Sequence, residues 1–164
     1  MAIRADADYR KGDGDMGVQL GSRNFDLPLE DSLLIRLDFT DDEAWRAVCQ
    51  AVQKPTPDDG FVGFFDFVDE RALDGTDVDE LIALLPDETF YVADSRTTSD
   101  PELSILVVGY AAEDDSEEAA LVPSSFRVIP SAAWMPENNL RIGNMDFEEF
   151  LDSVDEDGVL RGVD

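Results

Sequence analysis

Hydrophobic residues follow two alternating patterns along this chain from residue 32 onward. Short apolar runs rich in β-branched and aromatic residues predict strands. Segments with apolar residues at the i, i+3, i+4 and i+7 spacing predict helices that bury one face. The predicted strands are residues 32–38, 61–68, 89–95, 103–110 and 124–130. Three helices are predicted, each with one buried face. The first buries Trp45, Val48, Cys49 and Val52, the second Val78, Leu81, Ile82 and Leu85, and the third Phe147, Phe150, Leu151 and Val154.

Capping signals support the first and last of these helices. Thr40 and Glu43 have the spacing of a capping box, with a hydroxyl at the cap and a carboxylate three residues later. Asp146 and Glu149 have the same spacing at the last helix. The agreement between apolar spacing and caps makes an α/β fold the expected class.

The order of elements, β-α-β-α-β-β-β-α, predicts one compact α/β domain with a mixed sheet of about five strands covered by about three helices. Two crossover connections are expected to build a parallel part of the sheet. The segment between the third and fourth strands is too short for a crossover helix, so these strands should form an antiparallel pair.

The first 26 residues differ from the rest because they are rich in glycine and charge and show little periodicity. This composition is typical of a mostly flexible N-terminal arm, with a short extended piece at residues 18–20. The single α/β domain is therefore expected to span residues 27–164.

Charge is the most unusual property of the chain. Among 164 residues, 39 acidic side chains face 12 basic ones, which gives a formal net charge of −27. Such a surface repels phosphate backbones and anionic lipids, so neither direct nucleic-acid binding nor a membrane partner is expected. A basic protein partner or a divalent cation is favoured instead, although the same charge is also typical of a solvated surface that keeps a protein soluble, or of adaptation to high salt.

The absence of histidine removes the commonest general base and zinc ligand. The single cysteine, Cys49, rules out an intrachain disulfide and a thiolate zinc site, and its place on an apolar helix face predicts an unreactive thiol. The N-terminus lacks the apolar core of a signal peptide, and no apolar run is long enough to span a membrane. We expect a cytoplasmic protein and lean away from an enzyme.

Three stretches resemble an uncharacterised bacterial domain family that is found largely in actinobacteria. They are residues 31–52, 67–86 and 125–162, and together they cover most of the chain after residue 31 in the same order. Because the family is one of unknown function, the resemblance implies a single domain that ends at the C-terminal tail, and it implies no catalytic residues.

Two groups of aspartates are candidate metal ligands. Asp38 and Asp94 each follow a predicted core strand, so a parallel arrangement would bring them together at the carboxyl edge of the sheet, where Mg²⁺ could support hydrolysis. Asp155 and Asp157, followed by Gly158, match the middle of a calcium loop. The simpler interpretation assigns the first pair to strand and helix ends and the second to a helix end and turn. The sequence therefore predicts no required cofactor, with weak Ca²⁺ or Mg²⁺ binding as the alternative.

The segment from residue 134 to residue 147 is poor in charge by the standard of this chain and is predicted to be a long loop. It could recognise a partner through one aromatic anchor and several amides, or it could be an ordered loop whose tryptophan fills the core. The candidate partner-binding residues are Trp134, Asn138, Asn139, Asn144 and Met145.

These observations favour a non-enzymatic, acidic interaction module that binds a basic protein, as inhibitors, immunity proteins and nucleic-acid mimics do. The alternative is a domain or hydrolase that depends on Mg²⁺ or Ca²⁺ and uses the clustered aspartates.

Overall fold

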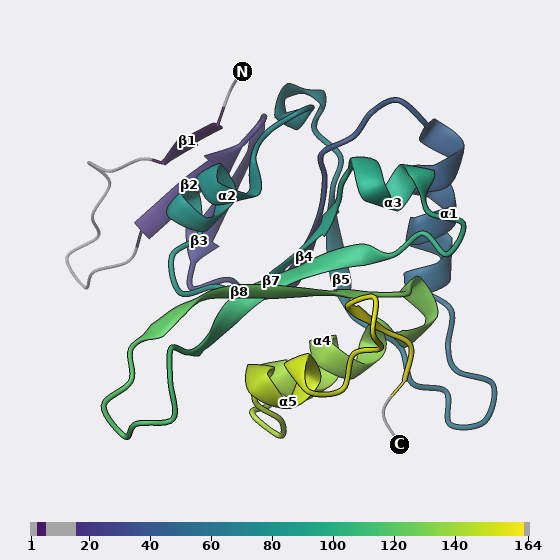
Figure 1. Cartoon of the computed structure of the whole chain (residues 1–164). Helices are drawn as coiled ribbons and strands as arrows, with labels where there is room; N and C mark the ends of the chain where they lie inside the picture. Colours follow the sequence, from purple (N-terminus) through teal and green to yellow (C-terminus); the bar gives the residue numbers. More distant parts are fainter. Residues whose placement is uncertain (1–2, 6–15, 163–164) are drawn as a thin grey trace.

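The computed structural model of the chain describes residues 3–5 and 16–162, and these form a mixed sheet with helices on both faces (Figure 1). The strand order in this sheet is β5-β4-β6-β7-β8-β9. The first three strands are parallel, β7 is antiparallel to both of its neighbours, and β9 runs parallel to β8. Its strands are β4 (Ser32–Arg36), β5 (Phe65–Val68), β6 (Phe90–Ala93), β7 (Ile105–Ala112), β8 (Leu121–Val128) and β9 (Val159–Leu160).

The α/β class, the mixed sheet and the antiparallel pairing of the third and fourth predicted strands are confirmed. The parallel strands are joined by two crossovers, from β4 through α1 to β5 and from β5 through α2 to β6. The helices are α1 (Asp42–Val52), α2 (Val78–Leu84), α3 (Ser95–Ser99), α4 (Trp134–Arg141) and α5 (Phe147–Leu151), with short 3-10 turns η1 (Arg71–Leu73) and η2 (Pro130–Ala132).

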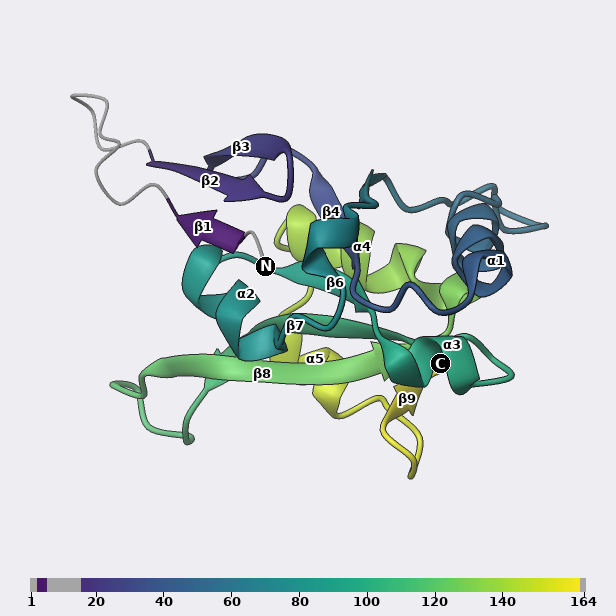
Figure 2. The same ribbon diagram turned by 90° about the horizontal axis from the view of Figure 1, so that it is seen from above.

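Two apolar clusters hold the layers together, one on each face of the sheet. Figure 2 shows the helices of the two layers, with α2 in front of the sheet and α5 behind it. The first contains side chains of α1 and α5, including Trp45 and Phe150. The second contains Leu81 of α2 together with Val18 and Leu20. Since β4 and β6 contribute side chains to both clusters, the middle of the sheet is buried on both sides, as their continuous apolar runs predict.

The N-terminal region contains structure that the sequence pattern did not reveal. Residues 16–27 form a hairpin of β2 (Met16–Leu20) and β3 (Arg23–Leu27), and β1 (Ile3–Ala5) pairs with β2. A mostly flexible arm was predicted through residue 26; residues 18–20, predicted to be extended, lie in β2. The hairpin is anchored because two alternating β2 side chains enter the core and because Glu70 accepts a hydrogen bond from the Ser22 amide at 2.5 Å. Residues 6–15 of the predicted arm lie outside the described residues.

The helix ends show which capping signals were correct. The capping box of Asp146 and Glu149 is present at α5. At α1 the cap is Asp41, whose carboxylate accepts a hydrogen bond from the Ala44 amide at 3.0 Å, so the prediction of Thr40 as the cap was wrong by one residue. The short α3 was not predicted.

Helix α5 packs unusually close to the sheet. A Cβ atom placed on Gly109 of β7 would lie 2.5 Å from the ring of Phe147, so only glycine allows this approach. Phe147 and Phe150 both pack against Phe126 of β8, with ring centroids 5.1 and 5.8 Å away. None of the helices formed by the described residues has an apolar stretch long enough to cross a bilayer.

Candidate functional site

The segment predicted to be a long recognition loop contains a helix. Residues Trp134–Arg141 form α4, and only the residues after it form a turn. The helix has no side-chain cap at its N-terminus, where it follows η2. Just beyond its C-terminal end lies Gly143, whose φ of 70° is the left-handed conformation typical after a helix. The prediction of a loop was wrong because α4 lacks a capping signal and carries two asparagines, which are poor helix formers.

The three asparagines of this segment bond to the protein itself. Asn138 donates to the backbone oxygens of Val62, at 3.0 Å, and Trp134, at 2.9 Å. The side chain of Asn139 donates to a backbone oxygen one turn earlier in α4 and accepts from Asn144 at 2.8 Å. Met145 packs against the core cluster that contains Phe150. These four predicted partner-binding residues therefore shape the segment, and Asn138 also fixes the neighbouring loop.

Trp134 stacks on Phe61, and the same loop carries a second exposed phenylalanine, Phe64. The rings of Phe61 and Trp134 stack with centroids 4.7 Å apart and an interplanar angle of 14°. Phe61 is 46% exposed, Phe64 is 60% exposed and Trp134 is half-buried. We call Phe61, Phe64 and Trp134 the aromatic patch. Residues 61–64 were predicted to begin a strand, but β5 starts only at Phe65, and this leaves the two phenylalanines on the surface.

A buried carboxylate holds the loop of the patch on α4. The side chain of Glu137 has no exposed surface. It accepts hydrogen bonds from the Phe64 amide at 2.8 Å and from the Ser32 hydroxyl at 2.8 Å, and it pairs with Arg141 at 3.3 Å. Glu137 thus joins α4, the start of β4 and the loop before β5 at one point.

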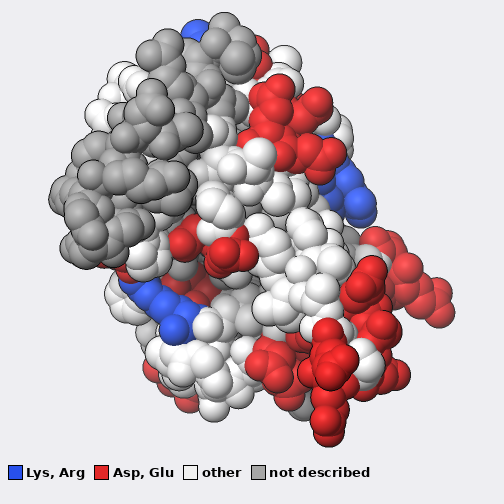
Figure 3. All heavy atoms as spheres, turned by 90° about the vertical axis from the view of Figure 1, so that its left-hand side faces the viewer, with Lys and Arg blue, Asp and Glu red and all other residues white. Residues whose placement is uncertain are grey.

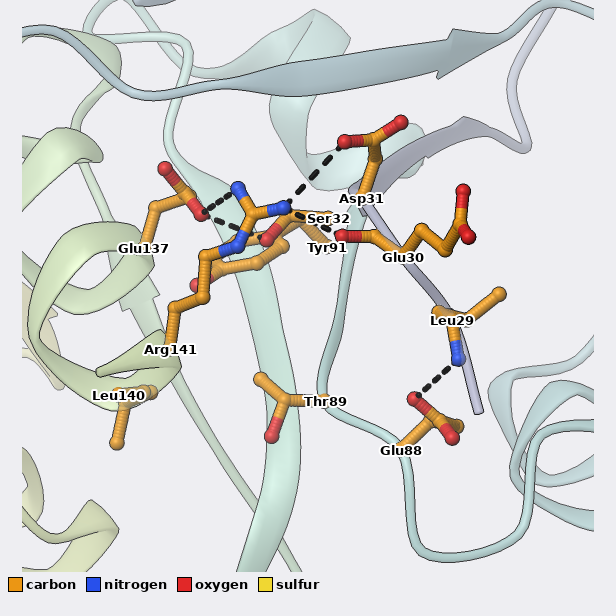
Figure 4. Close-up of a pocket in the computed structure, with 10 residues that line it drawn as sticks. All are labelled: Leu29, Glu30, Asp31, Ser32, Glu88, Thr89, Tyr91, Glu137, Leu140 and Arg141. Atoms are coloured by element: carbon orange, nitrogen blue, oxygen red, sulfur yellow. Dashed lines mark hydrogen bonds and ion pairs between the residues drawn. The ribbon is translucent and has the colours of Figure 1, made fainter. Parts of the chain in front are cut away.

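The same carboxylate borders a small cavity of about 140 Å³ between α4 and the sheet (Figure 4). In Figure 4 the guanidinium of Arg141 lies between Glu137 on one side and Asp31 with the Glu30 backbone oxygen on the other. Burial, and then the charge of Glu137, raises the pKa of Tyr91 well above its usual value, so this phenol stays protonated. We assign the cavity a structural role, because the polar groups around it bind one another.

Asp38 and Asp94 lie at the carboxyl ends of the parallel neighbours β4 and β6, as expected, but other groups occupy their oxygens. Asp38 accepts hydrogen bonds from the Thr40 amide at 2.9 Å and the Thr98 hydroxyl at 2.5 Å. Burial opposes ionisation of Asp38, but these hydrogen bonds outweigh it and lower its pKa. Asp94 caps α3 and pairs with Arg127.

Within residues 3–5 and 16–162 there is no group of three or more His, Cys, Asp or Glu side chains that could hold a metal ion. The magnesium hypothesis for Asp38 and Asp94 therefore has no geometric support in these residues.

The tail forms a turn that leads into β9, and an arginine occupies the place proposed for calcium. Arg161 pairs with Asp155 at 2.8 Å and with Asp157 at 2.7 Å. It also pairs with Glu102 at 2.6 Å, which fixes the tail to the loop before β7. Gly158, with a φ of 80°, supplies the turn. The carboxylates predicted as calcium ligands are thus bound to a cation of the chain itself.

These ion pairs predict a dependence of stability on pH. The hydrogen bond from Arg161 is the largest cause that lowers the pKa of Glu102 below 4.5 and that of Asp157 below 3.8. A lowered pKa stabilises the fold above the unfolded pKa, and this stabilisation is lost as pH falls through the folded pKa. Because the groups are exposed, the effect is small.

We therefore expect Arg161→Gln to lower the melting temperature slightly at pH 7 and to lower it less at pH 2, each relative to the unmodified protein. Thermal unfolding at both pH values measures this difference. Glu156→Gln, a change at an exposed residue of the same turn, serves as the control at both. An equal loss at the two pH values would show that Arg161 acts through packing and not through its ion pairs.

Sequence reasoning identified Trp134 but missed Phe61, Phe64 and Glu137. Two signals were present. Phe64 and Phe65 are adjacent, so a half-buried strand could not bury both side chains on one face. The spacing of Glu137 and Arg141 is that of an ion pair on one helix face, and it indicated a helix where a loop was expected.

Comparison with known proteins places the chain in a family without assigning it an activity. The model of the family "Domain of unknown function (DUF6924)" matches residues 31–163. The chain belongs to this family, which confirms the resemblance to a family of unknown function. No curated protein and no solved structure matches the chain. The hairpin of β2 and β3 precedes the matched range.

Proposed function

We propose that this member of the DUF6924 family acts by protein–protein contact and binds a basic partner, as inhibitors, immunity proteins and nucleic-acid mimics do. The observation that carries the proposal is the aromatic patch, in which Phe61 stacks on Trp134 and the same loop exposes Phe64, on an acidic protein. Aromatic side chains supply much of the binding energy at protein interfaces, because they bury a large area at a low entropic cost.

The patch is held in place before any partner arrives. The backbone around it is fixed by the hydrogen bond from the Phe64 amide to Glu137 and by that from Asn138 to the Val62 oxygen. The stacking of Phe61 on Trp134 restricts both rings. A surface ordered in this way loses less conformational entropy on binding than a mobile loop does.

Charge determines which kind of partner this surface favours. Asp58 and Asp59 are exposed in the loop that leads to Phe61. Elsewhere on the molecule, on the face shown in Figure 3, acidic groups also gather and basic side chains occupy only small areas. A net charge of −27 attracts a basic protein over long distances and speeds its association, and it repels an acidic one.

The chemistry of the chain supports binding more than catalysis. The sequence has no histidine. Burial, and then the charge of Asp69, raises the pKa of the Cys49 thiol to about 12, so the reactive thiolate is scarce at neutral pH.

The test is capture of a partner from the native host with the tagged protein and with the double variant Phe61→Ala/Phe64→Ala. We expect the unmodified protein to recover a basic protein, and we expect the double variant to recover roughly tenfold less of it. Because Phe61 is about half exposed and Phe64 more so, the free energy of unfolding should change by no more than about 1 kcal/mol.

Leu121→Ala is the matched control, because Leu121 is another exposed apolar side chain, in β8, and its loss should leave recovery unchanged. Equal recovery by the double variant, or recovery of acidic proteins alone, would contradict the proposal.

A further inference from the structure

A second surface feature lies at the carboxyl ends of β4 and β5 and shares no residue with the aromatic patch. It is a pocket of about 510 Å³ whose basic residues are Arg36, Arg46 and Arg71, and we call it the arginine pocket. Arg36 ends β4, Arg46 lies on α1, and Arg71 begins η1 after β5. Open α/β sheets commonly bind ligands outside the carboxyl ends of their parallel strands, and pockets for small ligands measure about 300–1,000 Å³.

The sign of its charge distinguishes this pocket. Its three arginines face two aspartates, Asp42 and Asp69, which leaves a net positive charge on a protein of net charge −27. In three other cavities formed by the described residues, acidic side chains outnumber basic ones. A cationic hollow within a strongly negative field is therefore a local feature of this edge of the sheet.

Arg36 has a different role from the other two arginines. Its side chain is 5% exposed and pairs with Asp42 at 2.7 Å and with Asp69 at 3.3 Å. It also donates to the backbone oxygen of Asp38 at 3.1 Å, and it stacks 4.2 Å above the ring of Phe39. Arg36 thus neutralises the two aspartates and holds the base of the pocket in place.

This arrangement leaves Arg46 and Arg71 available to a ligand. Both are exposed, and neither forms an ion pair within 4.0 Å with a described acidic side chain. Arg71 stacks 5.2 Å from the ring of Phe39, which orients its guanidinium. Arg36 is the main cause that lowers the pKa of Asp42, but Arg71 and Arg46 contribute, which indicates that both guanidinium groups lie near this side of the pocket.

We propose that the arginine pocket binds a small organic anion, with Arg46 and Arg71 holding its carboxylate or phosphate group. A guanidinium donates two parallel hydrogen bonds to such a group, and this geometry favours oxyanions over a simple ion such as chloride. The ligand is a small molecule, because the field of the whole protein repels extended polyanions such as nucleic acids. This site is separate from the proposed protein interface, so either proposal can fail without the other.

The test is an NMR titration of the full chain that follows its two indole N–H signals. Trp45 lines the pocket and Trp134 does not, so Trp134 is an internal control. The probes are sodium phosphate and sodium citrate, each against sodium chloride of equal ionic strength. We expect the Trp45 signal to shift to saturation, with a dissociation constant of about 1 mM or below for at least one probe. The probe that binds more tightly identifies the oxyanion.

The double variant Arg46→Gln/Arg71→Gln should weaken this binding about tenfold or more, because two charged hydrogen-bond donors are lost. Arg96→Gln is the matched control, since Arg96 is likewise exposed and forms no ion pair with a described acidic residue, and it should bind as the unmodified protein does. The proposal is overturned if neither probe saturates, if both tryptophan signals shift equally, or if the double variant binds like the unmodified protein.

Discussion

Replacing Glu137 by alanine should lower the free energy of unfolding by about 2–5 kcal/mol, because donors inside the protein lose their charged acceptor. The carboxylate is fully buried and accepts hydrogen bonds from the Phe64 amide, the Ser32 hydroxyl and Arg141. The variant leaves the first two donors without their acceptor inside the protein, and each such loss is costly. Denaturant unfolding followed by circular dichroism measures the change.

Two further variants test whether the loss of stability comes from the lost hydrogen bonds of Glu137. Glu137→Gln keeps the shape and one acceptor oxygen, so its loss of stability should be smaller than that of Glu137→Ala. Glu156→Ala removes an exposed glutamate and should change the free energy of unfolding by less than about 0.5 kcal/mol. If Glu137→Ala were no more destabilising than Glu156→Ala, Glu137 would not hold α4 and the loop of the aromatic patch together.

The second large effect is expected in the N-terminal hairpin. Leu20 has no exposed surface and belongs to the core cluster beneath α2. Leu20→Ala should lower the free energy of unfolding by about 2–5 kcal/mol, since a buried leucine is lost and a cavity is left behind. Thermal or denaturant unfolding of the full chain provides the measurement.

Gln19→Ala, a substitution at the neighbouring position of the same strand, is the control, because Gln19 points to the other face of β2 and its loss should change stability little. A small effect of Leu20→Ala, similar to that of Gln19→Ala, would mean that residues 16–27 form an appendage and not a part of the domain.

The helices and strands that could be predicted are those whose own residues show a clear hydrophobic pattern. Strands β6 and β7 are almost entirely apolar, β4 has the apolar centre Leu33–Ile35, and the face of α1 repeats with helical spacing. Hydrophobic burial dominates such elements, so pattern alone identifies them. The short segment between β6 and β7 likewise excluded a parallel pairing.

The elements that were missed depend on tertiary contacts. In β2 two alternating apolar side chains, Val18 and Leu20, enter the core, and the glycines around them hid this alternation. Helix α4 has neither a cap nor a strong apolar face, and buried Glu137 supplies much of what anchors it. A buried carboxylate is hard to recognise from the sequence when two of its donors, Ser32 and Phe64, come from distant segments.

For the candidate sites too, the sequence predicted local features but not the contacts between distant segments. The hydrophobic pattern predicted Asp38 and Asp94 at the ends of neighbouring strands. It could not show that Asp38 accepts a hydrogen bond from Thr98 or that Asp94 pairs with Arg127. Arg161 lies close to Asp155 and Asp157 in the sequence, and in the structure it forms ion pairs with both. The stacking of Phe61 on Trp134 joins segments 73 residues apart, and such a pairing has no signature in a single sequence.

The most direct measurement is the dissociation constant of the captured partner at several salt concentrations, for the unmodified protein and for Phe61→Ala/Phe64→Ala. If the chain binds a basic protein through the aromatic patch, affinity should fall as salt rises, because screening weakens the attraction between opposite charges. The double variant should bind about tenfold more weakly at every salt concentration, because the ring contacts are not screened. Affinity that is independent of salt, or equal for the two proteins, would contradict this function.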